Sequence, residues 1–249
     1  MTKSLVSLCC IGTGDAFGSG GRLNSCFHLN SPAGQMLIDC GCSSLIGMHR
    51  CGVVPAEIDI VVISHLHGDH FGGIPYLLLE GKYISQRTRP LTLIGPAGLQ
   101  KRVEMAAEAL YPGMIGKKGN FPVEYRPLDP KKPLQVNSAK ITCFQVKHGS
   151  SQRVYGLRVE VSGKVVSYTG DTEWTDNLIP LAQGSDLLIA ECVAYDQPVP
   201  SHLDYQTLQQ KRNLLACRRL ILTHMGPQML SQIRRLELET VNDGDIIEI

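Results

Sequence analysis

The stretch Ser64-His65-Leu66-His67-Gly68-Asp69-His70 places three imidazoles and a carboxylate within a few consecutive positions. It follows the apolar, β-branched run Ile58–Ile63, which predicts a buried strand, and it precedes residues 76–80, which predict a helix. On a turn between a strand and a helix, side chains can converge on one point. Imidazole and carboxylate are ligands that suit zinc, manganese or iron. The stretch therefore predicts a metal site, since a solvated surface loop has no need for three histidines.

The composition of the whole chain favours one domain. The chain has 249 residues, 43% of them hydrophobic, and no linker, repeat or low-complexity run, so we expect a single domain over residues 1–249. A net charge of +1 gives no global field toward nucleic acid or acidic lipid. Residues 1–8 are too short an apolar run for a signal peptide, and no apolar run approaches the ~20 residues of a membrane span. Nine scattered cysteines without a Cys-x-x-Cys pair predict reduced thiols and a cytoplasmic protein.

The pattern His-x-His-x-Asp-His after an apolar strand resembles the metallo-β-lactamase superfamily. The resemblance covers essentially the full chain and implies an α/β (α+β) fold, arranged as a four-layer αββα sandwich. It also implies ligands after three later strands, at His148, Asp171 and His224. The implied ligands of one metal are His65, His67 and His148. Those of the other metal are Asp69, His70 and His224, with Asp171 between the two.

Two aspartates have roles for which the sequence leaves alternatives open. Asp171 follows a strand and Gly170, so its carboxylate can point into the site and give one oxygen to each metal; capping the next helix is the alternative. The resemblance implies that Asp39, at the end of the strand Gln35–Ile38, orients a ligating imidazole. A turn or a helix cap would equally explain Asp39.

The implied chemistry is hydrolysis by two divalent metal ions. Zinc is the favoured metal, with Mn²⁺ and Fe²⁺ as alternatives. Two ions ~3.5–4 Å apart can hold a bridging hydroxide and clamp the oxygens of a substrate. We expect Asp69 to orient that nucleophile and to take its proton.

Within the superfamily, the chain looks like the ribonuclease Z branch. The residues that carry this likeness are Gly12-Thr13-Gly14, Gly170-Asp171-Thr172, Glu191 and His202. In that branch a histidine paired with a glutamate handles the leaving group, and His202 and Glu191 stand in those places. A phosphodiester needs such a proton donor for its departing oxygen. An ordinary loop histidine beside a helix start is the alternative for His202.

The chain departs from ribonuclease Z of the well-known type, which carries a long tRNA-gripping arm between the fourth His ligand and the bridging Asp. Here only 23 positions separate His148 from Asp171, and they predict a plain hairpin. We therefore expect a compact phosphodiesterase for small or cyclic phosphodiesters. Nucleic acid is the less favoured partner, no membrane partner is expected, and a homodimer is compatible with the sequence.

Four other functions use the same fold. A ribonuclease Z-like RNA endonuclease and a lactonase or β-lactamase would use the same metals. A diiron oxidoreductase typically has Glu where His67 stands and a flavin domain, and a metal-free scaffold would have lost ligands. The Glu191–His202 pair favours phosphodiesters over carbonyl substrates.

The remaining pattern predicts how the chain is arranged around these residues. A first strand is expected at Ser4–Ile11, followed by a glycine-rich loop at Gly12–Gly21 that lines the rim of the site. The segments 121–126, 134–136 and 140–147 are expected as strands of a second sheet. An amphipathic helix is expected over Leu99–Leu110, and its apolar face consists of Val103, Ala106, Ala107 and Leu110. Tyr111–Asn120 is expected to be a mobile loop near the site.

Overall fold

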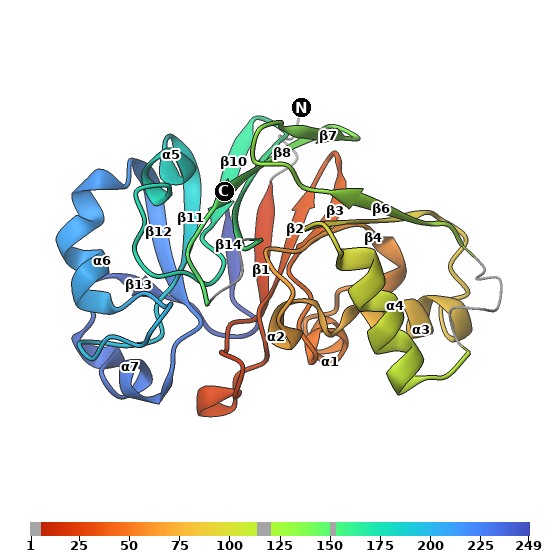
Figure 1. Cartoon of the computed structure of the whole chain (residues 1–249), viewed down its shortest axis with the longest axis horizontal. Coiled ribbons are helices and arrows are strands. Elements are labelled where there is room, and N and C mark those ends of the chain that lie inside the picture. Colours follow the sequence, from red (N-terminus) through yellow and green to blue (C-terminus); the bar gives the residue numbers. More distant parts are fainter. Residues whose placement is uncertain (1–5, 114–120, 150–152) are drawn as a thin grey trace.

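Two seven-stranded sheets form the centre of the computed structural model, which describes residues 6–113, 121–149 and 153–249 (Figure 1). The first sheet has the strand order β14 (Ile246–Glu248), β1 (Ser7–Gly12), β2 (Cys26–Ser31), β3 (Gly34–Ile38), β4 (Ile58–Val62), β5 (Leu91–Gly95) and β6 (Val123–Pro127). The second has the order β13 (Glu239–Thr240), β12 (Cys217–Thr223), β11 (Ser185–Glu191), β10 (Lys164–Tyr168), β9 (Tyr155–Val161), β8 (Ala139–Gln145) and β7 (Leu134–Val136). Ser4 and Leu5 of the predicted first strand, and residues 114–120 of the predicted mobile loop, lie outside the described residues.

Helices cover the outer face of each sheet, as Figure 1 shows on its right and left sides. The first sheet is accompanied by α1 (Ser44–Arg50), α2 (Gly68–Phe71), α3 (Ile74–Tyr83) and α4 (Leu99–Leu110). The second is covered by α5 (Leu178–Ala182), α6 (Tyr205–Lys211) and α7 (Pro227–Ser231). This arrangement confirms the predicted four-layer αββα sandwich.

The alternation of side chains along each strand builds these layers. On β1, Leu8 and Cys10 belong to the core between the two sheets, whereas Cys9 and Ile11 pack with the helices outside. Successive side chains of a strand point to opposite faces, so a strand covered on both faces is apolar throughout. The second sheet repeats the pattern at β11, where Ile189 faces the other sheet and Leu188 faces the helices.

The segment predicted at 121–126 lies in the other sheet from the one expected. Its strand β6 pairs in parallel with β5, with Leu91 opposite Val123, and so extends the first sheet. The connection between β5 and β6 contains α4, which makes a strand–helix–strand unit with parallel strands. The prediction was wrong because an alternating pattern identifies a strand but not the neighbour with which it pairs.

Helix α4 has the predicted bounds, but its buried face differs. Val103 and Ala107 of the predicted apolar face are buried, and Leu99 is buried with them. Leu110 is 46% exposed, because it lies in the last turn of the helix, beyond the part that packs on the first sheet. The apolar face predicted for this helix is therefore buried at Val103 and Ala107 but not at Leu110.

Parallel strands bring distant parts of the chain to one edge of the sandwich. Strands β3 to β6 run parallel to one another in the first sheet, and β10 to β13 run parallel to one another in the second. In open α/β sheets, ligands bind outside the carboxyl ends of such strands. Predicted metal ligands follow β4, β10 and β12, and His148 follows β8, which is antiparallel to β7 and β9.

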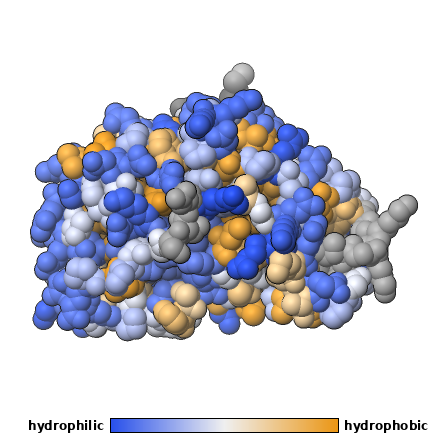
Figure 2. All heavy atoms as spheres, in the orientation of Figure 1, coloured by the Kyte–Doolittle hydropathy of each residue, from blue (hydrophilic) through white to orange (hydrophobic). Residues whose placement is uncertain are grey.

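The exposed surface does not point to a binding site as clearly as the sheet edge does. Figure 2 shows polar side chains over most of one face, with apolar ones in scattered groups. Exposed apolar residues such as Ile46 and Met105 lie on the outer helices, and exposed apolar residues of this kind are normal. In the described parts of the chain, no helix has the length and the apolar character needed to cross a bilayer.

Candidate metal centre

The ligand-rich stretch occupies the turn between β4 and α3. The chain leaves the sheet at Ile63, and the short helix α2 begins after His67, so that the following side chains turn back toward the sheet edge. His65 and His70 are buried there, with their rings 4.1 Å apart, and His67 is exposed beside them. The turn therefore does what the sequence predicts, which is to converge several imidazoles on one point.

The structure brings the other predicted ligands to the same point from the second sheet. One group of side chains whose ligand atoms lie within 4.8 Å of one another consists of His65, His67 and His148. A second such group consists of Asp69, His70, Asp171 and His224. These two groups match the division between two metals that the sequence implies. A third such group consists of His148, Asp171 and His202, so the predicted proton donor lies beside a ligand from each of the other two.

Three buried polar atoms at this point have no hydrogen-bond partner among the described residues. They are Nε2 of His65, Nε2 of His70 and Oδ1 of Asp171. Buried polar atoms in proteins are normally satisfied, because an unpaired one costs ~1–3 kcal/mol or more. Lone pairs on imidazole and carboxylate that converge in this way fit a bound divalent cation. The donor set therefore fits the divalent metal site that the fold implies.

The Asp171 carboxylate lies between the two groups. Its Oδ2 is 3.3 Å from Nε2 of both His70 and His224, and 3.9 Å from Nε2 of His65 and His148. Burial alone would raise the pKa of Asp171, but the neighbouring His224 and His70 hold it well below the usual range. An ionised carboxylate in this place can give one oxygen to each of two cations.

Hydrogen bonds fix which nitrogen each imidazole turns toward the centre. Asp39 accepts from His70 Nδ1 at 2.7 Å and from the Ser64 hydroxyl at 2.8 Å, and its other oxygen accepts from the Ser64 N–H at 2.7 Å. Because the Ser64 hydroxyl donates to Asp39, its oxygen accepts from His65 Nδ1, 3.1 Å away. Both imidazoles therefore carry hydrogen on Nδ1 and turn Nε2 toward the centre of the ligand groups.

Two further contacts hold the imidazoles from the second sheet. The Ser201 carbonyl lies 2.9 Å from His148 Nδ1 and can only accept, so His148 carries hydrogen on Nδ1 and turns its Nε2 lone pair toward His67 Nδ1, 3.1 Å away. The Ser25 hydroxyl lies 3.1 Å from His224 Nδ1, and Thr13 O accepts from the His224 N–H at 2.9 Å. Ser25, Ser64 and Ser201 have no distinguishing pattern in the sequence, and only the folded chain reveals their roles.

Burial keeps most of these imidazoles neutral. It lowers the pKa of His65, His148 and His224, so their lone pairs are available at neutral pH. His70 is the exception, because the carboxylates of Asp171 and Asp39 raise its pKa against the effect of burial.

The predicted catalytic residues lie beside the two ligand groups. Asp69 Oδ2 is 3.1 Å from His70 Nε2, within the second group. His202 Nδ1 is 3.1 Å from both oxygens of the fully buried Glu191, which also accepts from the Thr172 N–H. The His202 ring is 4.7 Å from that of His148. The structure thus brings together every residue that the sequence proposes for the site.

The pKa values of both members of the Glu191–His202 pair are raised. Burial raises the pKa of Glu191 to about 8. The hydrogen bond to Glu191 raises the pKa of His202, although burial opposes the change. Raised pKa values favour the protonated forms, so the pair is suited to supply a proton at the edge of the ligand groups.

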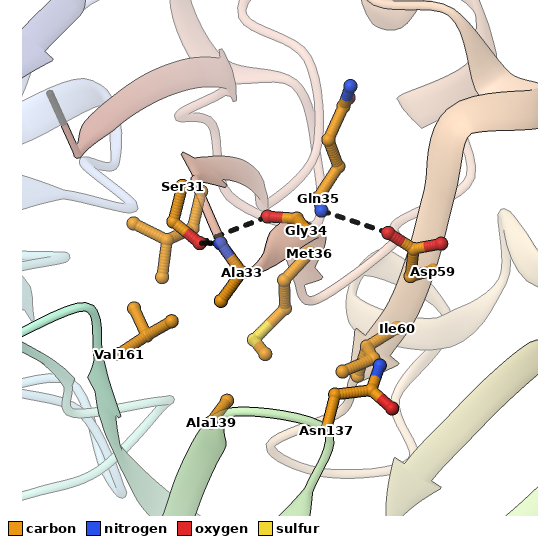
Figure 3. Close-up of a pocket in the computed structure, with 11 residues that line it drawn as sticks. Ser31, Ala33, Gly34, Gln35, Met36, Asp59, Ile60, Asn137, Ala139 and Val161 are labelled. Carbon is orange, nitrogen blue, oxygen red and sulfur yellow. Dashed lines mark hydrogen bonds between the residues drawn. The ribbon is translucent and has the colours of Figure 1, made fainter. Parts of the chain in front are cut away.

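Two hollows in the surface lie away from the ligand groups. Figure 3 shows a cavity of about 10 Å³ between the β2–β3 hairpin and the second sheet, lined by residues such as Met36, Ile60 and Val161. A larger hollow of about 380 Å³ contains Asp59 and Thr92, from the amino ends of β4 and β5. Neither includes a predicted ligand or catalytic residue. His28 hydrogen-bonds Gln35 at 3.0 Å and is likewise outside both ligand groups.

Replacing Asp39 with Asn should weaken metal binding about 10–100-fold while the fold persists. Asp39 has a φ of 57°, a conformation that Asn tolerates, so the change tests the carboxylate and not the backbone. One of its hydrogen bonds to Ser64 or His70 would lose its acceptor. Competition with a chelator for Zn²⁺ measures the affinity, and Asp59→Asn in the same sheet is the control. Unchanged zinc affinity in Asp39→Asn would contradict the orienting role.

Comparison with known proteins agrees with the fold and the ligand groups described above. The model of the family described as Anti-Pycsar protein Apyc1 matches residues 6–244 of this chain. The "Probable metallo-hydrolase YhfI" of Bacillus subtilis is 28% identical over 243 residues, which cover 95% of this chain and 93% of the relative. Its crystal structure, described as a metallo-β-lactamase fold protein, has a TM-score of 0.79 at 23% identity and covers 99% of this chain and 100% of that one.

Ribonuclease Z is a second kind of relative. The enzyme of Agathobacter rectalis is 31% identical over 163 residues, which cover 64% of this chain and 51% of the relative. The chain thus spans about half the length of this ribonuclease Z.

Proposed function

Because this chain belongs to the family of Anti-Pycsar protein Apyc1 and to the ribonuclease Z-like branch of the metallo-β-lactamase superfamily, we propose that it hydrolyses small or cyclic phosphodiesters. The general class is a metallo-hydrolase fold with a divalent metal site, and the phosphodiester substrate is the more specific part of the proposal. The observation that carries the finer proposal is the contact of His202 with Glu191 beside the ligand groups. When a phosphodiester is hydrolysed, the oxygen of the departing group is strongly basic and needs a proton. The Glu191–His202 pair is placed to donate that proton.

The metal ions would be held by the two ligand groups, with Asp171 between them. A donor set dominated by imidazole favours zinc among the divalent ions, and zinc is part of the proposal. When bound, two such ions supply Lewis acidity toward phosphoryl oxygens and lower the pKa of bound water toward ~7.

The protein groups would orient the reactants and move protons. Asp69 lies among the ligands of the second group and is the acceptor for the proton of the attacking water. His202 donates a proton to the departing oxygen. Glu191 holds His202 through Nδ1, which leaves Nε2 of that ring for the substrate. This is the arrangement of a base-orienting carboxylate behind a catalytic imidazole.

The segment between His148 and Asp171 supports a small substrate. It contains the β9–β10 hairpin, which turns at Ser162 and Gly163 and pairs from Val161 opposite Lys164 to Leu157 opposite Tyr168. Binding energy must therefore come from the rim of the site, including the loop of residues 12–21. A small substrate can bury most of its surface in such a place, whereas a folded RNA would contact it with one end only.

We expect measurable hydrolysis of a chromogenic phosphodiester and of some cyclic nucleotides, with little processing of a tRNA precursor. A protein that neutralises several phosphates loses affinity steeply with added salt, whereas we expect a shallow dependence here. Steady-state rates at several salt concentrations measure both properties, and Asp69→Asn shows that the activity belongs to this site.

Activity on RNA in place of small phosphodiesters would instead favour a ribonuclease Z-like endonuclease. Efficient, strongly salt-sensitive cleavage at the 3′ side of a precursor tRNA, without activity on small phosphodiesters, would refute the proposal. Hydrolysis of lactones or β-lactams in place of phosphodiesters would refute it as well.

A further inference from the structure

Ser201 has a backbone conformation that is unusual for its residue type. Its φ is 68°, in the left-handed region that favours glycine. It follows the exposed residues Val199 and Pro200 and is itself half-buried. A residue is held in this conformation only when its surroundings determine it, and such positions cluster at functional sites.

The carbonyl of Ser201 contacts a metal-ligand candidate. It accepts from His148 Nδ1 at 2.9 Å, across 53 positions of sequence. A partner on Nδ1 fixes the tautomer and the direction of a ligating imidazole, and its loss typically lowers metal affinity. Because the acceptor is a backbone carbonyl, its direction depends on the φ and ψ of the loop and not on a side chain.

The residue after Ser201 is the proton donor of the proposed reaction. His202 donates its N–H to Val199 O at 3.1 Å, which closes the turn around Ser201. Downstream, Leu203 is buried and its carbonyl accepts from the Val193 N–H at 3.1 Å, which fixes the end of the loop. One short turn therefore presents a carbonyl to His148 and an imidazole to Glu191.

We infer that Ser201 is a positioning residue whose left-handed conformation sets both the ligand nitrogen of His148 and the place of His202. Metal binding and the proton donor are thereby coupled through one peptide. This inference rests on the proposed function for the role of His202, but its effect on metal binding does not depend on the substrate.

The test compares three replacements in the zinc-loaded protein. Ser201→Val introduces a β-branched residue that avoids the left-handed region, so the carbonyl turns away and Zn²⁺ affinity falls about 10–100-fold. Ser201→Gly adopts that region freely and keeps the affinity of the original chain. Ser162→Val is the matched control, since Ser162 has a φ of 51° in the β9–β10 turn, away from the ligands. Competition with a chelator gives the affinities.

Each outcome bears on the inference. Loss of zinc affinity in Ser201→Val, with retention in Ser201→Gly and Ser162→Val, supports it. Unchanged affinity in Ser201→Val, or equal loss in Ser201→Gly, overturns it, because the backbone conformation would then not matter. If Ser201→Val does not fold, Ser201→Thr retains the hydroxyl, is also β-branched, and gives the same comparison.

A second measurement separates this inference from the proposed function. Hydrolysis of a phosphodiester with a poor leaving group should fall more in Ser201→Val than hydrolysis of one with an activated leaving group, because His202 is displaced. Absence of phosphodiesterase activity in the unchanged protein would refute the proposed function, and the zinc comparison would still decide the inference.

Discussion

Asp171→Ala should reduce the metal content of the purified chain from about two divalent ions to about one or fewer. The Asp171 carboxylate lies within 3.3 Å of Nε2 of both His70 and His224, and its second oxygen is buried with no hydrogen-bond partner in the described parts of the chain. Removing it takes away a shared ligand and the negative charge that lets two cations approach each other. Elemental analysis of protein purified without chelator measures the content.

Controls for Asp171→Ala separate the bridge from general damage to the sheet. Asp186→Ala removes a carboxylate from the start of β11, at the other end of a neighbouring strand, and should retain both ions. Asp171→Asn keeps the shape and one acceptor oxygen, and should be intermediate. A full metal complement in Asp171→Ala would refute the bridging role.

His202→Ala should lower turnover of a phosphodiester by roughly 10²–10⁴-fold while the metal content is unchanged. His202 lies outside the two groups assigned to the metals, but its Nδ1 contacts Glu191 and its ring is next to that of His148. Loss of a proton donor matters most when the leaving oxygen is strongly basic. The reduction should therefore shrink for a substrate with an activated leaving group, and steady-state rates on a leaving-group series measure this.

The matched control for His202→Ala is His49→Ala. His49 is exposed on α1, outside both ligand groups, and its replacement should leave rates and metal content unaltered. Equal losses in His202→Ala for good and poor leaving groups would exclude the acid role. Loss of metal in that variant would instead make His202 a ligand.

The ligand residues could be anticipated from sequence for a physical reason. His148, Asp171 and His224 each come shortly after an apolar strand, and carboxyl ends of parallel strands meet at one edge of a sheet. The local cluster from His65 to His70 needs only a tight turn, which α2 provides. Residue type and position along the chain therefore contain most of the information about these side chains.

The surrounding contacts could not be predicted in the same way. Hydroxyls such as that of Ser25 and carbonyls such as that of Ser201 are common, and only the docking of the two sheets brings them to His224 and His148. The position of β6 shows the same limit for the fold. Its alternating pattern is compatible with either sheet, and pairing with β5 is decided by the connection through α4.

The distribution of the ligands over both sheets has a consequence for how long the folded chain persists. The ligands extend from His65 to His224, so the site forms only after both halves of the sandwich have docked. A cation that binds only the completed site stabilises the folded state by mass action. Contacts that are absent from the folding transition state change the unfolding rate and leave the folding rate nearly unaltered. Bound metal therefore lengthens the lifetime of the native chain without accelerating its formation.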